Sequence, residues 1–166
     1  MMIVMKKAIP VAREEERAME NCYLDDLAVG QRWTTGSVTV DAEAIKAFAG
    51  AFDLQPFHLD EEAARDTLFG GLAASGWHTA ALSMRLLTES GTPFVGGIVG
   101  AGGEIHWPRP TRPGDTLTVE SEILEVTPSR SRPDRGMITV RNRTFDQNGE
   151  TLQVLVAKLV VPRRPA

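Results

Sequence analysis

Hydrophobic and polar positions in the first half of the chain predict a strand followed by helices. Residues 32–40 (RWTTGSVTV) are rich in β-branched side chains, which favour a strand. Asp41 can cap the helix that follows, and a second short amphipathic segment lies in residues 60–68 (DEEAARDTL). The apolar side chains of the first helix fall on one stripe: Ile45, Phe48, Ala49 and Phe52.

Residues 75–91 (SGWHTAALSMRLLTESG) predict a longer helix, with Ser75 at its start and Gly91 at its end. Its apolar side chains are spread around nearly the whole circumference: Trp77, Ala80, Ala81, Leu82, Met84, Leu86 and Leu87. A helix that is apolar on most sides is typically enclosed by the rest of the fold. We therefore expect this helix to be central.

The second half of the chain predicts an antiparallel run of strands that can enclose this helix. The strand-like segments are 100–110, 115–126, 136–146 and 151–161, and turn-rich sequences separate them. Asn148-Gly149, in the last of these turns, is a strong hairpin signal. A buried helix followed by antiparallel strands indicates an α+β fold, and uncovered sheet edges favour a dimer.

The length of the chain and its charge distribution predict one domain with an N-terminal extension. A chain of 166 residues is most simply a single domain, which we place at residues 23–166. Residues 1–22 contain the charged run REEERAME and are interpreted as a solvated N-terminal extension, either a short helix or disordered.

Composition narrows the classes of partner and compartment. The formal net charge of −4 and the pI near 5.4 argue against nucleic acid as a partner. A lone cysteine, Cys22, fits a reducing compartment. The first lysines follow an apolar run, which is the wrong order for a signal peptide, and no run reaches the roughly 18 apolar residues of a membrane span. We expect a soluble cytoplasmic protein that does not bind membranes.

The segment AFDLQPFHLD, residues 51–60, places an acid and an imidazole close together. Asp53 precedes His58 by five residues, and Pro56 between them limits the freedom of the loop. The neighbouring Phe52 and Phe57 can exclude water, which would raise the pKa of the carboxyl and lower that of the imidazole. The pair is therefore a candidate for general acid–base chemistry. The alternative is a polar turn after a helix.

Ser75 and Gly76 at the start of the central helix form the second candidate site. The amide of Gly76 has no partner within the helix and lies at the positive end of the helix dipole, where it can stabilise an oxyanion. The alternative is simple capping, which is favoured for Ser75. On this apolar helix His78 is interpreted as a core histidine.

The sequence lacks the motifs of several other classes of enzyme and metal site. The chain contains no G-x-S-x-G, H-E-x-x-H or C-x-x-C sequence. The glycine-rich residues 97–107 lead into a strand and not into a helix, so they are a poor phosphate loop. The three histidines of the chain (His58, His78 and His106) are not spaced as metal ligands, and we expect no metal site.

Four ordered motifs resemble the MaoC-like dehydratase family of hot-dog-fold proteins, and within it the (R)-specific enoyl-CoA hydratases. They are FDLQPFHLD, FGGLAASGWHTAAL, RPTRPGDTL and PSRSRPDRG, and the resemblance covers about residues 24–162. It implies a long central helix wrapped by a curved antiparallel sheet, in a homodimer or a multiple of it. It also implies that Asp53 and His58 hold and activate a water, while the Gly76 amide binds a thioester oxygen. Gln55 and Ser75 replace an asparagine and a histidine of the family pattern.

The reaction implied by this resemblance is reversible hydration of a 2-enoyl thioester, or dehydration of the matching 3-hydroxyacyl thioester, in fatty acid metabolism. His58 takes a proton from water, and Asp53 orients that water and protonates C2. No cofactor is implied other than coenzyme A or acyl-carrier protein as part of the substrate. An acyl-CoA thioesterase and a non-catalytic acyl-CoA-binding subunit remain as alternatives, because one fold hosts several activities.

A substrate that carries phosphates needs a local concentration of positive charge on this acidic protein. The densest concentration is Arg130, Arg132 and Arg135, with Arg109 and Arg112 in the preceding turn-rich segment. Arginine suits phosphate because its planar guanidinium donates two parallel hydrogen bonds. We therefore predict that Arg130, Arg132 and Arg135 bind the substrate. The alternative is a set of solvated loop residues. Ser75, at the start of the central helix, is a further predicted substrate-binding residue.

Overall fold

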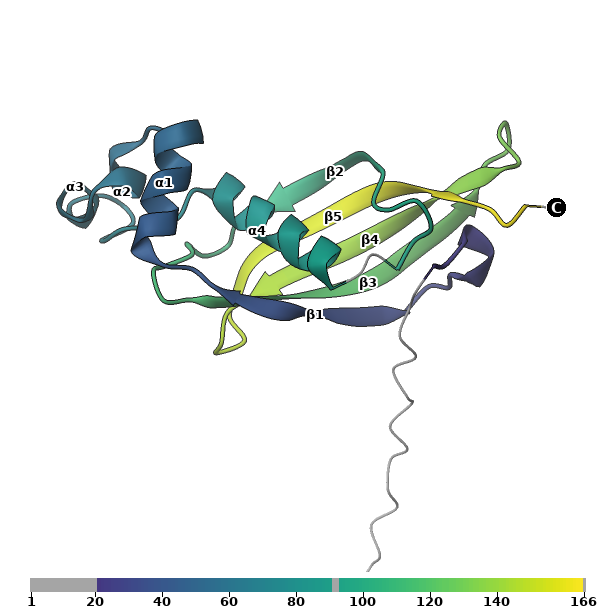
Figure 1. The fold of residues 1–166 in the computed structure, drawn as a ribbon, viewed down its shortest axis with the longest axis horizontal. Helices are drawn as coiled ribbons and strands as arrows, with labels where there is room; N and C mark the ends of the chain where they lie inside the picture. Colours follow the sequence, from purple (N-terminus) through teal and green to yellow (C-terminus); the bar gives the residue numbers. More distant parts are fainter. Residues whose placement is uncertain (1–20, 91–92, 166) are drawn as a thin grey trace, which may run out of the picture.

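The computed structural model describes residues 21–90 and 93–165. Most of the N-terminal extension predicted from the sequence, and Gly91 at the expected end of the central helix, lie outside these residues. Within them the α+β prediction is confirmed, because five antiparallel strands form one sheet and helices occupy one face and one end of it (Figure 1). No helix of this described part is long and apolar enough to cross a membrane.

The sheet has the strand order β1-β3-β4-β5-β2, with every neighbouring pair antiparallel. Its strands are β1 (Arg32–Thr39), β2 (Gly100–His106), β3 (Thr116–Pro128), β4 (Arg135–Phe145) and β5 (Thr151–Pro162). Buried and exposed positions alternate along β3 and β4, as expected of strands with one face against a core. The turn at Asn148-Gly149 joins β4 to β5, which confirms the predicted hairpin.

Helix α4 (Gly76–Glu89) lies against one face of the sheet, and three short helices gather beyond one end of it (Figure 1). These are α1 (Ala42–Phe52), α2 (Pro56–Leu59) and α3 (Glu61–Arg65). The predicted caps are present: the Asp41 side chain accepts a hydrogen bond from the Ala44 amide, and the Ser75 hydroxyl accepts one from Trp77. The short 3-10 helix η1 (Leu24–Asp26) packs at the opposite end.

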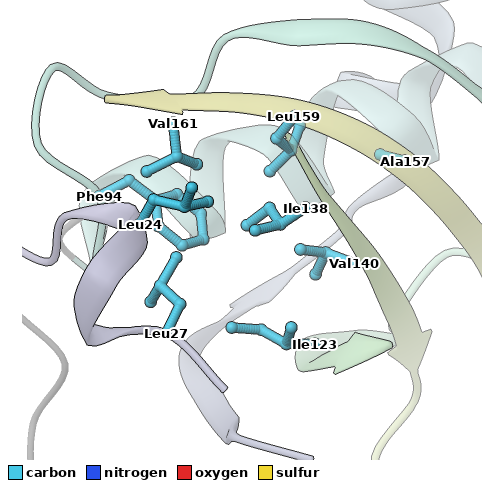
Figure 2. Packing of buried hydrophobic residues seen from close by; sticks show 9 residues of the cluster. All are labelled: Leu24, Leu27, Phe94, Ile123, Ile138, Val140, Ala157, Leu159 and Val161. Carbon is cyan, nitrogen blue, oxygen red and sulfur yellow. The ribbon is translucent and has the colours of Figure 1, made fainter. Parts of the chain in front are cut away.

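Two apolar clusters form the core. One joins η1 to the end of the sheet distant from α1, and its side chains converge from η1, Phe94 and strands β3, β4 and β5 (Figure 2). The other joins α1 and α4 to the sheet through Ile45, Leu86, Leu87 and Leu117, among others. The first cluster is built largely from the alternating apolar positions of β3, β4 and β5, which is why these strands were predictable, whereas the second also draws on α1, α4 and the loops beside them.

The central position predicted for α4 is confirmed by its packing against β1, β3 and β5, but one side of the helix is uncovered. A single chain does not enclose this helix: Trp77 and Met84 are 60% and 42% exposed. The side that faces the sheet buries polar as well as apolar residues, including Thr79 and Ser83. These hydroxyls are satisfied by hydrogen bonds to Thr111 and Thr144, so their burial costs little. One side of α4 remains open.

Candidate active site

Asp53 lies where α1 ends, and His58 lies on the next helix. Asp53 caps the C-terminus of α1, and its amide donates to the carbonyl of Ala49. Gln55 has the extended backbone expected before a proline. The segment after it was predicted to be a stiff loop, and this is wrong: Pro56 begins the one-turn helix α2, because its fixed φ and missing N–H suit the first helical position.

The two side chains meet as predicted. His58 Nε2 lies 3.5 Å from Asp53 Oδ2, and the side chains are 5% and 17% exposed. His58 Nδ1 lies 2.7 Å from the carbonyl oxygen of Ala73. Because a carbonyl only accepts hydrogen bonds, Nδ1 carries a proton, and in the neutral form of the ring the lone pair of Nε2 faces Asp53.

This geometry suits a bridging water. Two acceptors 3.5 Å apart cannot bond directly to each other, whereas a water molecule can donate one hydrogen to each. When His58 is protonated, Nε2 instead donates to the carboxylate and the two groups form an ion pair. The pair is therefore suited to hold a water and take a proton from it.

The expected rise in the pKa of Asp53 is wrong in direction. Hydrogen bonding from the Ser75 hydroxyl, and then from the Gln55 amide, lowers the pKa of Asp53, with a smaller contribution from the charge of His58. Gln55 Nε2 donates to Asp53 Oδ1 at 2.7 Å. These effects exceed that of burial, and Phe52 gives little shielding because it is 77% exposed. Asp53 is therefore a carboxylate at neutral pH.

Both departures from the MaoC-like sequence pattern lie beside this carboxylate. Gln55 and Ser75 are the two side chains whose hydrogen bonds lower the pKa of Asp53. Ser75 is fully buried, and its hydroxyl also accepts from the Trp77 amide. Its contact with substrate stays a prediction, but the replacement of histidine by serine at this position leaves Asp53 with a hydrogen-bond donor.

A pocket of about 400 Å³ brings the first group of candidates together. Asp53, His58, Ser75 and Gly76 all line it. Other residues complete its walls: Gln55, Phe57, Phe69, Ala74, Trp77, Thr79 and the segment Trp107–Thr111. Arg109, Pro110 and Thr111 belong to the RPTRPGDTL motif of the sequence analysis, whereas Trp107 and Pro108 belong to none of its motifs.

Gly76 is the first residue of the 14-residue helix α4. Among the residues that the structure describes, its amide N–H donates to no protein group, so it is free to bind a ligand in the pocket. A side chain here would collide with Trp107, because a Cβ atom would lie 2.7 Å from Cε2 of that indole. Glycine is therefore required for the close approach of the ring.

The arginines divide into three environments. Arg109 lines the pocket and pairs with Glu150 at 2.9 Å. Arg112 points inward, where its guanidinium donates to the carbonyls of Phe69, Gly71 and Leu72, so it is a structural brace.

Arg130, Arg132 and Arg135 do not join this pocket in the same chain. The turn between β3 and β4 that bears them lies at the far end of the sheet from α1–α3 (Figure 1). Arg135 pairs with Pro162 across the sheet and His106 with Val154, and these β5 residues are about 26 Å apart along the strand. Arg130 and Arg135 line a separate outer groove with Lys158. Their role in substrate binding stays a prediction.

The other two histidines, His78 and His106, do not line the pocket that contains His58. His78 is 6% exposed and stacks on Phe48 with ring centroids 4.6 Å apart, and burial lowers its pKa. The prediction of a core position is confirmed, although in the described part of the chain its Nδ1 has no hydrogen-bond partner. No cluster of three or more metal-ligating side chains occurs among residues 21–90 and 93–165.

A helix held by a curved antiparallel sheet, with an acid–imidazole pair and a free amide at the helix start, defines a hot-dog domain with a candidate acid–base site. The family model described as "MaoC like domain" matches residues 26–144. The chain therefore belongs to the MaoC-like family, which confirms the resemblance seen in the sequence.

Known relatives agree with this assignment. The crystal structure of the MaoC-like dehydratase from Rhodospirillum rubrum is 61% identical, with a TM-score of 0.85, and the match covers 88% of this chain and all of that one. R-Hydratase PhaJ1 from Pseudomonas aeruginosa is 27% identical, with a TM-score of 0.66 and coverage of 87% and 88%. The 3-hydroxybutyryl-CoA dehydratase of Methylorubrum extorquens is 32% identical over 111 residues, 66% of this chain and 69% of the relative.

Proposed function

We propose that this protein catalyses the reversible hydration of a 2-enoyl thioester, and the dehydration of the matching 3-hydroxyacyl thioester. The observation that supports this most directly is the 3.5 Å distance between His58 Nε2 and Asp53 Oδ2. Gly76, whose backbone N–H lies at the start of α4, lines the same pocket. The names of the dehydratase and hydratase relatives support the same class of reaction.

In the hydration direction, His58 Nε2 takes a proton from the bridging water as its oxygen bonds to C3. The electron pair of the double bond moves towards the thioester oxygen, where the Gly76 amide and the start of α4 stabilise the negative charge. The imidazolium then gives its proton to C2. The low pKa of Asp53 leaves it no proton to donate, so its carboxylate orients the water and stabilises the imidazolium. This proposal differs from the protonation of C2 by Asp53 that the family resemblance implies.

The test is a set of enoyl-CoA thioesters of increasing chain length, with two signals followed in parallel. Hydration removes the absorbance of the conjugated double bond without releasing thiol. Release of free thiol instead would indicate a thioesterase. Saturable binding with neither signal, in a chain that retains Asp53 and His58, would indicate an acyl-CoA-binding subunit and contradict the proposal.

We propose that the protein is a homodimer or a multiple of it. The open side of α4 exposes Trp77 and Met84, and β2 is an edge strand with most of its residues exposed. Apolar helix surface and unpaired strand edges both favour association. We expect sedimentation at micromolar concentration to give a mass of at least twice 18.1 kDa. A monomer would contradict this.

Arg130, Arg132 and Arg135 are proposed to contact the phosphates of coenzyme A. Because they lie far from the pocket of their own chain, this requires that the turn reach a neighbouring subunit's pocket. Replacing all three with glutamine should raise KM for a CoA thioester several-fold and weaken its salt dependence, with kcat nearly unchanged. The same replacement of Arg85, which pairs with Glu89 on α4, is the control.

Substrates that carry only the pantetheine arm lack these phosphates, so the triple substitution should leave their KM unchanged. An unchanged KM for the CoA thioester, or an equal rise for the pantetheine thioester, would remove this turn from the binding site.

A further inference from the structure

We propose that Trp107 is a positioning residue for the Gly76 amide and that Gln153 holds it in place, an inference that rests on the proposed function. The indole ring forms a wall over the start of α4, and a buried hydrogen bond fixes that wall. Neither residue belongs to a motif that the sequence analysis selected.

The first observation is the contact between Trp107 and Gly76. A Cβ atom built on Gly76 would lie 2.7, 2.8 and 3.0 Å from Cε2, Cδ2 and Cζ2 of the indole, all atoms of the fused ring system. The ring therefore lies directly against the Cα of Gly76, a residue that lines the pocket. Trp77 supports it with an edge contact, at 5.4 Å between ring centroids and 78° between planes.

The second observation is how Trp107 is held. Its Nε1 donates to Oε1 of Gln153 at 2.9 Å, and Gln153 is 1% exposed although Trp107 is 39% exposed. Gln153 Nε2 in turn donates to Ser83 Oγ at 3.3 Å, and that hydroxyl donates to the carbonyl of Thr79. The ring is thus tied, through β5, to the same helix whose first amide it covers.

The Gly76 amide, partly shielded from water by the indole ring, should stabilise negative charge more effectively than a fully solvated amide. The ring prevents water from approaching Gly76 on one side, and electrostatic interactions are stronger where water is excluded. It also limits the directions from which a thioester oxygen can reach the N–H. Because the charge on that oxygen grows towards the transition state, the benefit should appear in kcat with little change in KM.

The alternative is that Trp107 and Gln153 only pack the fold. Trp107→Phe removes the indole N–H, and Gln153→Met removes the acceptor at similar volume. If they position Gly76, each should lower kcat about tenfold at unchanged KM, and the double variant should be no worse than either single one. If they only pack the fold, the midpoint of thermal unfolding falls while kcat at a temperature well below it stays unchanged.

Matched controls exist elsewhere in the chain. Trp33→Phe removes an indole N–H from a ring that packs on Phe94, and Gln147→Met removes an amide that accepts from the backbone of Thr116. Both should leave kcat at the wild-type value, because neither residue lines the pocket.

A steric rescue tests the contact itself. Gly76→Ala keeps the amide but forces the ring away, and we expect kcat to fall about 100-fold. Adding Trp107→Leu makes room for the methyl group, so the double variant should recover to the level of Trp107→Leu alone. Wild-type kcat in Gly76→Ala, or a double variant below both single ones, would overturn the inference.

The closing experiment does not depend on turnover. Butyryl-CoA, a saturated thioester, is titrated into the protein while the ¹H–¹⁵N resonance of Gly76 is followed. We expect a shift in the wild type that is at least halved in Gln153→Met and Trp107→Phe but kept in the two controls. Such a result with no hydration would sink the proposed reaction and leave the inference standing. No shift in the wild type, or equal shifts in all variants, would overturn the inference.

Discussion

We expect His58→Ala and Asp53→Ala each to lower kcat/KM for an enoyl-CoA by about 10³-fold, because both hold the attacking water and His58 is its base. His58 Nε2 lies 3.5 Å from Asp53 Oδ2, so neither group binds that water properly alone. Residues that act as a unit are non-additive, and the double variant should be little worse than either single one. Initial rates on a short enoyl-CoA measure this effect.

Isosteric variants separate chemistry from folding. His58 is 4% exposed and bonded to the carbonyl of Ala73, so alanine leaves a hole and an unpaired acceptor. His58→Asn places an amide N–H near the position of Nδ1 while removing the base, and Asp53→Asn removes only the charge. Both should fold as the wild type does by circular dichroism and remain inactive. Near-normal turnover in the two alanine variants would refute the mechanism.

The regular elements were predictable because their signals are local. The apolar stripe of α1 and the Asp41 cap lie within twelve consecutive residues, and the strands alternate with period two. Pro56 is also a local signal, but it is compatible with two structures. It ends a helix before it or begins one after it, and here it begins α2, whose His58 ring lies 2.7 Å from the carbonyl of Ala73, 15 residues along the chain.

The sequence brought together the candidate residues that one motif contains, but it missed the pocket residues that separate elements contribute. Asp53 and His58 are neighbours in sequence and meet in the pocket. Trp107 and Gln153 come from different strand ends and meet only when β2 pairs with β5. The pKa of Asp53 was predicted in the wrong direction, because its donors matter more than its aromatic neighbours and Ser75 is 22 residues away.

The helix α4 illustrates the same limit. Its apolar residues predicted a central position, which is confirmed by its packing against β1, β3 and β5. The burial of Thr79 and Ser83 could not be predicted, because it depends on hydrogen-bond partners in other elements. The hydrophobic pattern therefore predicted the central position of this helix but not which side of it faces the sheet, and Trp77 is exposed in the single chain.

The largest effect on stability is expected at Arg112. Its guanidinium donates to the carbonyls of Phe69, Gly71 and Leu72, in a segment with no regular secondary structure. Arg112→Met leaves these acceptors unpaired and should lower the free energy of unfolding by about 3 kcal/mol. Arg85→Met, which breaks only an exposed pair with Glu89, should change it by less than about 0.5 kcal/mol. Urea unfolding of the two variants measures the difference.

Loss of the Arg112 hydrogen bonds should also lower catalytic activity. The segment that they hold leads directly into Ala73, whose carbonyl orients His58. At a temperature where Arg112→Met remains folded, we expect kcat to fall while the chain still binds substrate. Arg112→Lys restores the charge but not the planar fork, and a single ammonium cannot reach three carbonyls in the same way, so its recovery should be partial. Equal unfolding midpoints for Arg112→Met and Arg85→Met would mean that the loop holds its shape without the brace, and that His58 is oriented by α2 alone.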